Sequence, residues 1–264
     1  MKRLPLAGCR VLITRPRRAG EDLAERLQAL GAIPLLFPAI DIRSPEDPRP
    51  LEEAARQAPA FDWILFTSAN GVHAFMQAFQ STGGSLRDLA RARLGAIGPA
   101  TARALQRYGL TVDYLPPVYL SEAMAEGLGE VKGRRILLPR ADIARRDLAE
   151  RLRARGAEVV EVTAYRVVLG GDPEVLRAIL TPRPHRVTFT SPSTARALAE
   201  LLERLQEALR PADLPAVCIG PITAAEARAL GFPIAAVARE HTQAGLIQAL
   251  VESWIRGSAT GLAG

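Results

Sequence analysis

The sequence predicts an α/β protein with parallel sheets, and two observations carry that prediction. Short apolar runs alternate with amphipathic helical segments along the chain, a rhythm typical of parallel sheets that helices cover on both faces. The same pattern then occurs a second time, at a nearly constant distance in the sequence. Because 264 residues are enough for two ordinary domains, we expect two domains, each built around one sheet.

Three pairs of segments define the internal repeat, and each pair links a strand to the helix that follows it. Near-constant offsets over three pairs indicate duplication of one unit. The pairs are Arg10–Arg15 and Asp22–Leu27 with Arg135–Arg140 and Asp147–Leu152 (offset 125), Phe66–Ser68 with Phe189–Ser191 (offset 123), and Ile97–Ala102 with Ile219–Ala224 (offset 122).

The repeated pattern of a strand followed by a helix predicts the following elements, in chain order. After a strand at residues 10–14, Leu23, Leu27 and Leu30 recur at helical spacing, with acidic residues at the start and Gly31 as a C-cap. A strand at 32–37 follows at once. Four later strands are each expected to run into a helix that begins at a small or hydroxyl residue: 63–67 before Ser68, 94–97 before Gly98, 186–190 before Ser191 and 216–219 before Gly220.

Two extended segments complicate the division into domains. Residues 37–43 and 162–168 both continue as extended chain after a strand, and both are followed by loop signals. A simple duplication would place the boundary near residue 130. Paired crossing strands would instead fit a hinge, with the first strand-helix-strand unit grouped with the C-terminal third. The residues alone leave both arrangements open.

Composition limits the classes of function. The net charge is +6, almost all of it from arginine, which favours an anionic partner. The two cysteines, Cys9 and Cys218, are too few for a disulfide framework, and His73, His185 and His241 have no metal-binding spacing. We therefore expect no metal. No apolar stretch is long enough to cross a bilayer and no secretion signal opens the chain, so we expect a cytoplasmic protein.

The candidate binding residues stand where strands end and helices begin. Ligands of parallel α/β folds bind at the carboxyl ends of the strands, and helix N-termini there present free backbone N–H groups to anions. We expect the ligand in a cleft between the two domains. The candidate residues at these ends are Thr14, Arg15, Ser68, Ala69, Asn70, Thr101, Arg140, Ser191, Ser193 and Thr223.

Tyr165 is the candidate for chemistry. It lies in one of the extended segments, and its counterpart in the other copy is Ile40, so the fold itself does not require the hydroxyl. The sequence contains no glycine-rich nucleotide loop, no hydrolase nucleophile elbow and no zinc-protease motif. Its arginines are interspersed with acids and only 5% of its residues are aromatic, which argues against nucleic-acid binding.

At these residues the chain resembles the uroporphyrinogen-III synthase family. The resemblance extends to about residue 253 and lies in the order and spacing of six short motifs. These are Val11–Pro16, Phe66–Ser68, Ile97–Thr101, Thr163–Tyr165, Phe189–Ser193 and Ile219–Thr223.

The resemblance implies two Rossmann-like, flavodoxin-type domains with parallel sheets, joined by a two-stranded hinge ladder. Domain 1 would comprise residues 1–37 and 169–256 and domain 2 residues 44–162. The linker strands would be 38–43 and 163–168, with a disordered tail at 257–264.

The resemblance also implies a reaction. The family cyclises hydroxymethylbilane, a linear tetrapyrrole with eight carboxylates, to uroporphyrinogen III, with loss of water and inversion of the terminal pyrrole ring and without a cofactor. By position, Tyr165 matches the family's tyrosine that assists loss of the hydroxyl. The cleft hydroxyls are matched by Ser68, Thr101, Ser191, Ser193 and Thr223. We therefore expect a monomeric lyase that binds neither nucleic acid nor membrane.

Two other hypotheses remain at this stage. A duplicated protein with crossing strands also fits a non-enzymatic, two-lobed module that closes a hinge around an anionic small molecule. The positive charge alone would fit a nucleic-acid-binding protein, whose affinity would depend steeply on salt.

Overall fold

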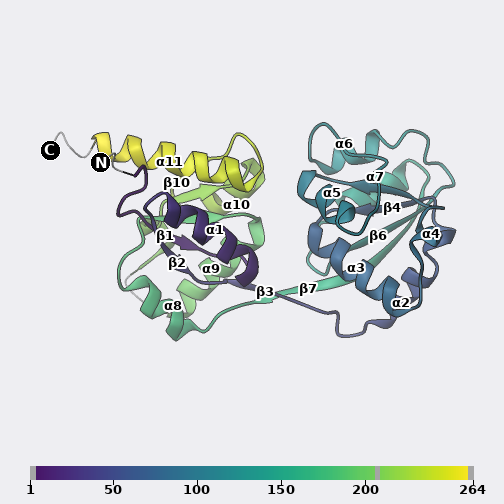
Figure 1. The fold of residues 1–264 in the computed structure, drawn as a ribbon, viewed down its shortest axis with the longest axis horizontal. Helices are drawn as coiled ribbons and strands as arrows, with labels where there is room; N and C mark the ends of the chain where they lie inside the picture. Colours follow the sequence, from purple (N-terminus) through teal and green to yellow (C-terminus); the bar gives the residue numbers. More distant parts are fainter. Residues whose placement is uncertain (1–3, 206–208, 261–264) are drawn as a thin grey trace. The chain divides into compact units, whose positions relative to one another are not determined.

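The computed structural model describes residues 4–205 and 209–260 and divides the chain into two compact units (Figure 1). Unit 1 combines the residues up to Asp41 with those from Val168 onward, and unit 2 is the uninterrupted segment Ile42–Val167. Within the described part of the chain, no helix has both the length and the apolar character needed to span a membrane.

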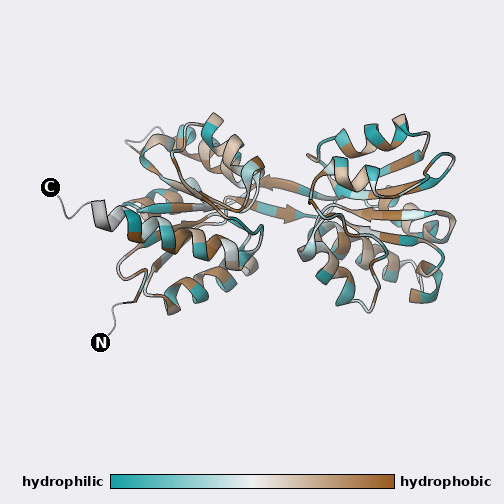
Figure 2. Ribbon diagram, turned by 90° about the horizontal axis from the view of Figure 1, so that it is seen from above, coloured by the Kyte–Doolittle hydropathy of each residue, from teal (hydrophilic) through white to brown (hydrophobic). Residues whose placement is uncertain are grey.

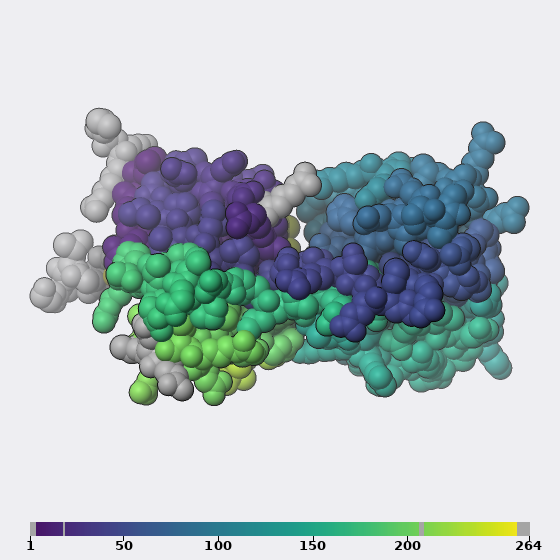
Figure 3. Space-filling model, turned by 90° about the horizontal axis from the view of Figure 1, so that it is seen from below, coloured from purple at the N-terminus to yellow at the C-terminus, as the bar shows by residue number. Residues whose placement is uncertain are grey.

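Unit 1 contains a five-stranded sheet in the order β10-β9-β8-β1-β2. Its four strand pairings are all parallel. The N-terminal strand therefore lies beside a strand from the last third of the chain, and Figure 3 shows the N-terminal residues next to the segment that follows Val168. The strands are β1 (Arg10–Ile13), β2 (Ile33–Leu36), β8 (Arg186–Phe189), β9 (Ala216–Cys218) and β10 (Ile234–Val237).

Helices cover both faces of this sheet. On one face, Val11 and Ile13 of β1 pack with Leu27 and Leu250 in a single buried cluster. Leu12, between them, is equally buried and points to the other face. The helices are α1 (Arg17–Ala29), α8 (Pro173–Leu180), α9 (Pro192–Leu205), α10 (Pro221–Ala229), α11 (Gln243–Thr260) and the 3-10 turn η2 (Pro211–Asp213).

Unit 2 contains the second five-stranded sheet, in the order β3-β7-β6-β4-β5. The pairings β4–β5, β4–β6 and β6–β7 are parallel. The divisions between the units, after Asp41 and after Val167, fall inside the neighbouring strands β3 and β7. The strands are β3 (Ile40–Arg43), β4 (Trp63–Phe66), β5 (Arg93–Ala96), β6 (Arg135–Ala141) and β7 (Glu158–Leu169).

The core of unit 2 also has two layers. Alternate residues of β4 serve the two faces: Ile64 and Phe66 join one buried cluster, whereas Trp63 and Leu65 join the other. The apolar strands therefore lie between helices with one polar face, as the hydropathy colours in Figure 2 show. The helices are α2 (Arg49–Arg56), α3 (Ala69–Ser81), α4 (Leu86–Leu89), α5 (Pro99–Gln106), α6 (Ser121–Glu126), α7 (Asp147–Ala154) and the 3-10 turn η1 (Ala58–Ala60).

The prediction of an α/β fold with parallel sheets is confirmed, but three details differ. Helix α1 begins at Arg17, a turn before the acidic residues at which its start was expected. The first extended segment is interrupted between β2 and β3, where Pro38 has no N–H to donate to a ladder, whereas β7 is continuous over 12 residues. Helix α11 continues to Thr260, so residues 257–260 do not form the expected tail, and 261–264 lie outside the described residues.

Candidate functional site

In unit 2, the carboxyl end of β4 leads directly into helix α3. Ser68 is extended and caps α3, because its Oγ accepts a hydrogen bond from the N–H of Gly71 at 3.0 Å. Ala69 and Asn70 form the first residues of the helix, and Asn70 is exposed. A Cβ at Gly71 would lie 2.9 Å from the carbonyl oxygen of Pro139, so glycine lets the helix start approach β6 closely.

Tyr165 of β7 reaches the same place. Its hydroxyl lies 3.0 Å from Oγ of Ser68, although 97 residues separate the two in sequence. Ser68 therefore contacts both the amide of Gly71 and the phenol of Tyr165. The structure brings together one predicted helix cap and the predicted catalytic residue.

The environment of Tyr165 keeps its phenol protonated. The side chain is 8% exposed, and burial raises the pKa of Tyr165 because it disfavours the phenolate. The hydrogen bond with Ser68 lowers this pKa, and the negative charge of Asp142 raises it further. At neutral pH, Tyr165 is consequently a neutral hydrogen-bond donor.

The next helix start in unit 2 follows β5. Gly98 is the N-cap of α5 and Pro99 occupies its first turn, where the missing N–H of proline costs no helical hydrogen bond. Thr101 is 4% exposed in that same first turn. The predicted Thr101 therefore lies at the carboxyl edge of the sheet, but largely inside the protein.

Arg140, which its position predicts to bind an anion, makes its contacts within unit 2. Its side chain is buried, one guanidinium nitrogen pairs with Glu161 of β7, and another donates to the carbonyl of Ala144. Glu161 also binds Arg153. These bonds hold the guanidinium of Arg140 inside unit 2, where it shares the carboxylate of Glu161 with Arg153.

In unit 1, the residue that follows strand β1 bonds to the sheet itself. Thr14 is fully buried and donates its hydroxyl to the carbonyl of Thr188 at 2.9 Å, which ties β1 to β8. The hydroxyl of Thr14 is therefore engaged within the sheet.

Arg15 has an environment unlike that of its repeat partner. Position 36, which corresponds to Glu161 at the 125-residue offset, holds leucine. Burial lowers the pKa of Arg15, while the nearby charge of Asp22 raises it. One guanidinium nitrogen lies 3.5 Å from Oε1 of Gln243, the first residue of α11.

Among the described residues, Arg15 and Gln243 each keep one hydrogen-bond donor without a partner. Within the described chain, the buried Nε of Arg15 and the buried Nε2 of Gln243 have no hydrogen-bond partner. Buried donors nearly always find partners, so this pair is suited to an added acceptor. Sequence reasoning did not find Gln243, since 228 residues separate it from Arg15; its place at the start of a helix after β10 was the available signal.

The hydroxyl residues of unit 1 gather at the starts of α9 and α10. The Oγ atoms of Ser191 and Ser193 lie 2.8 Å apart, and Ser191 accepts from the N–H of Thr194 at 3.4 Å. Gly220 is the N-cap of α10, and Thr223 in its first turn is 4% exposed. All these residues follow the carboxyl ends of β8 and β9.

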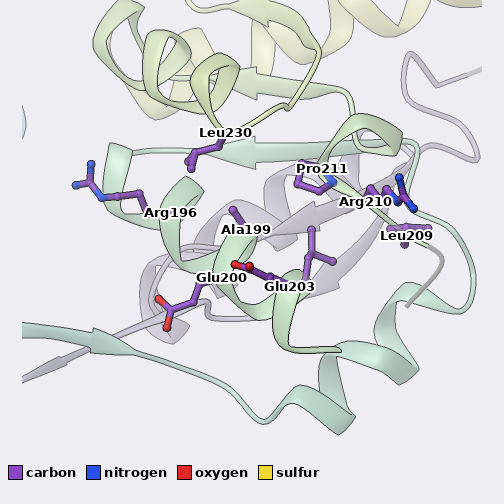
Figure 4. A pocket seen from close by; sticks show the side chains of 9 residues that line it. Arg196, Ala199, Glu200, Glu203, Leu209, Arg210, Pro211 and Leu230 are labelled. Carbon is purple, nitrogen blue, oxygen red and sulfur yellow. The ribbon is translucent and has the colours of Figure 1, made fainter. Parts of the chain in front are cut away.

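A pocket within unit 1 lies away from these strand ends. It has a volume of about 640 Å³ and is formed by α9, the residues around Pro211 and Leu230 (Figure 4). Arg196, Glu200 and Glu203 line it, and none of the predicted site residues does. The described residues contain no group of three or more His, Cys, Asp or Glu side chains placed to hold a metal.

The fold and the site define a class: α/β proteins with parallel sheets whose strand ends present helix N-termini and hydroxyl groups. Comparison with known proteins narrows that class. A model of the family described as uroporphyrinogen-III synthase HemD matches residues 21–248. The chain belongs to the uroporphyrinogen-III synthase family.

Individual relatives agree with this assignment. The chain is 31% identical to the uroporphyrinogen-III synthase of Synechococcus elongatus over 97% of its own length and 99% of the relative's. It is also 31% identical to the porphyrin biosynthesis protein HemD of Ruminiclostridium josui, over 94% of this chain and 49% of that protein. A crystal structure of a mutant uroporphyrinogen III synthase from Thermus thermophilus superposes with a TM-score of 0.68 at 24% identity, over 94% of this chain and 100% of that one; this likeness supports the fold.

Proposed function

We propose that this chain is a lyase that cyclises hydroxymethylbilane to uroporphyrinogen III, with loss of water and inversion of the terminal pyrrole ring. The observation that carries the proposal is the match to the uroporphyrinogen-III synthase family over residues 21–248. The near-complete alignment with the Synechococcus elongatus enzyme supports it. We further propose that the chain acts as a monomer. We also propose that it needs no cofactor, because the reaction involves no net oxidation or reduction.

The substrate's carboxylates would bind at the helix starts. Four helices, α3, α5, α9 and α10, begin just after the carboxyl end of a strand, and their first N–H groups favour anions. Ser68, Asn70, Ser191 and Ser193 stand at two of these starts and can add side-chain hydrogen bonds. The buried Thr101 and Thr223 would shape the first turns of the other two.

Arg15 and Gln243 would bind one further carboxylate. Nε of Arg15 and Nε2 of Gln243 are both donors without a partner in the described chain, and a carboxylate offers two acceptor oxygens. A charge-assisted hydrogen bond from a guanidinium is about twice as strong as a neutral one. This pair would therefore contribute more to affinity than a single helix start.

Tyr165 would donate a hydrogen bond to the departing hydroxyl oxygen of the substrate. Oγ of Ser68 accepts from the amide of Gly71, so its own hydrogen can point at the phenol oxygen 3.0 Å away. The phenol hydrogen is then available for the substrate. Because burial raises the pKa of Tyr165, the phenol would act as a neutral donor and not as a strong acid.

The larger part of the rate enhancement would come from holding the substrate. Ring closure with inversion requires the terminal pyrrole to meet the first ring through its substituted carbon, by way of a spiro intermediate. Fixing two reacting groups in the right geometry is worth on the order of 7–11 kcal/mol in well-oriented model systems. We therefore expect no single side chain to be indispensable.

We also propose that both units are Rossmann-like domains of the flavodoxin type, joined by a hinge at β3 and β7. The strand order β2-β1-β8-β9-β10 supports this for unit 1, since it corresponds to the order 2-1-3-4-5 of flavodoxin-like sheets. In unit 2 the series β7-β6-β4-β5 begins in the same order. The passage of the chain between the units inside β3 and β7 supports a hinge there.

The test is to supply hydroxymethylbilane to the purified protein, oxidise the products and separate the porphyrin isomers. We expect isomer III to predominate. Spontaneous closure yields isomer I, so isomer I alone, in the same amount as in a sample without protein, would contradict the proposal. Binding of the bilane without turnover would favour the non-enzymatic binding module instead.

A further inference from the structure

Each unit carries a ring side chain against the N-cap glycine of a site helix. In unit 2, a methyl group at Gly98 would lie 3.6 Å from Cγ of Tyr119, which is van der Waals contact. In unit 1, a methyl group at Gly220 would lie 3.1 Å from Cδ2 of His241. Both rings thus lie close to the backbone at the start of α5 or α10, and at Gly220 the absence of a Cβ leaves room for the ring.

The two rings are equivalent in the repeat. Tyr119 and His241 differ by 122 residues, as Gly98 and Gly220 do. The sheets keep the same offset between these points: Gly95 bridges Tyr114 in unit 2, and Val217 pairs with Ala236 in unit 1. Helices α6 and α11 also begin at the equivalent residues Ser121 and Gln243. The ring is therefore a shared feature of both copies, although its chemical type differs.

Exposed apolar side chains stand close in sequence to these rings or to the N-cap glycines that the rings contact. In unit 2, Leu115, Val118 and Leu120 are 41%, 54% and 37% exposed, and Tyr119 between them is 38% exposed. In unit 1, Ile222 in the first turn of α10 is 44% exposed and Val237 at the end of β10 is 37% exposed. Large exposed apolar patches mark binding surfaces, and these exposed side chains lie within five residues in sequence of a ring or of an N-cap glycine.

We propose that Tyr119 and His241 are substrate-contacting residues, one in each unit, that pack against pyrrole rings of the linear tetrapyrrole. The inference rests on the proposed function and adds to it the groups that recognise the rings. A tetrapyrrole alternates flat heterocycles with acidic side chains. The rings and their apolar neighbours would take the heterocycles, while the N–H groups of α5 and α10 take the carboxylates.

The test compares removal of each ring with its replacement by another ring. In Tyr119→Ala and His241→Ala, we expect KM for hydroxymethylbilane to rise about 3- to 10-fold each, the range expected for loss of one aromatic contact. Tyr119→Phe and His241→Phe keep a ring and should stay within about twofold of wild-type KM. Circular dichroism and melting temperature establish that every variant is folded.

Leu86→Ala is the matched control, because Leu86 is 47% exposed in unit 2 but lies in α4, before β5 and away from the strand's carboxyl end. Its KM should equal the wild-type value. The inference would be overturned if the alanine variants fold and keep the wild-type KM. It would also be overturned if the phenylalanine variants show the same rise in KM as the alanine variants. In either of these outcomes the proposed function still holds as long as the wild-type protein makes isomer III. If the wild-type protein makes no isomer III, the proposed function itself is wrong.

Discussion

The hydroxyl of Ser68 contacts the hydroxyl of Tyr165 at 3.0 Å while capping helix α3. The Ser68 side chain thus caps helix α3 and also orients the phenol of Tyr165, which lies in strand β7. This double use couples local helix stability to the proposed chemistry, and mutation can separate the two effects.

Tyr165→Phe should lower kcat without unfolding the protein. The ring packs in the core of unit 2, and phenylalanine preserves that packing while removing the donor. We expect a loss of up to about 2–3 kcal/mol of transition-state stabilisation, or roughly 30- to 150-fold in kcat. Steady-state kinetics with isomer analysis provides the measurement, and an unchanged kcat would remove Tyr165 from the mechanism.

Ser68→Ala should lower both stability and kcat. Loss of an N-cap costs about 1 kcal/mol of unfolding free energy, and the phenol also loses its partner. Asp172→Ala is the control, because Asp172 caps α8 by accepting from the N–H of Glu174 at 2.8 Å. The control should lose similar stability in denaturant titrations and keep its kcat; an equal loss of kcat in both variants would make the Ser68 effect merely structural.

The ionisation of Tyr165 should be visible only in strongly alkaline solution. Burial raises its pKa above the usual 10, so folding favours the protonated phenol. Its contribution to stability is complete below pH ~10, where the unfolded phenol is protonated too, and is lost as pH rises through the folded-state pKa. The unfolding free energy of wild type minus that of Tyr165→Phe should be constant through neutral pH and decrease above ~10. A decrease between pH ~7 and ~9 would contradict this assignment.

The two repeat-related arginines should respond in opposite ways to mutation. Arg140→Met leaves Glu161 with only Arg153 as an ionic partner, and we expect unfolding free energy to fall by about 2–3 kcal/mol. Arg15→Met should affect stability little and raise KM about 10- to 100-fold, the value of a hydrogen bond to a charged group. Denaturant titration and kinetics on both variants check this contrast, and a destabilised Arg15→Met with unchanged KM would refute it.

The cysteines should be unreactive in the native protein. Both are fully buried, and burial raises the pKa of Cys9 to about 11 and that of Cys218 to about 12, so thiolate is scarce at neutral pH. Alkylation followed by mass spectrometry should find neither modified until denaturant is added. Rapid labelling of either thiol in the folded protein would show that the surrounding core opens readily.

The repeat made much of the fold predictable, because hydrophobic periodicity and constant offsets depend on local sequence. The helix starts at Ser68, Gly98, Ser191 and Gly220 follow from the same pattern and were found at the expected strand ends. The roles of Arg15 and Arg140 were not separable by position. Their contacts differ because Glu161 forms an ion pair with Arg140, while Leu36 occupies the place equivalent to Glu161 in the other copy.

Contacts between distant segments were the least predictable features. The contact between Gln243 and Arg15 depends on how α11 packs on the sheet. No short sequence motif predicts that packing. The burial of Thr14 is similar: the residue follows a strand as a ligand-binding residue would, yet its hydroxyl ties β1 to Thr188. In both cases the local sequence determines which side chain is present, and the tertiary fold determines which group that side chain contacts.

The pairing of β1 with β8 has a consequence for biosynthesis. The strands of the second sheet all lie between Ile40 and Leu169, so that sheet can form as soon as this stretch leaves the ribosome. Strand β1 emerges before unit 2, yet its central neighbour, β8, is translated more than 170 residues after it. At roughly 5–20 residues per second, that segment waits on the order of ten seconds or more for its partner. Strand β1 is thus made before unit 2 but completed only after it, and during this interval its apolar residues are open to non-native pairing.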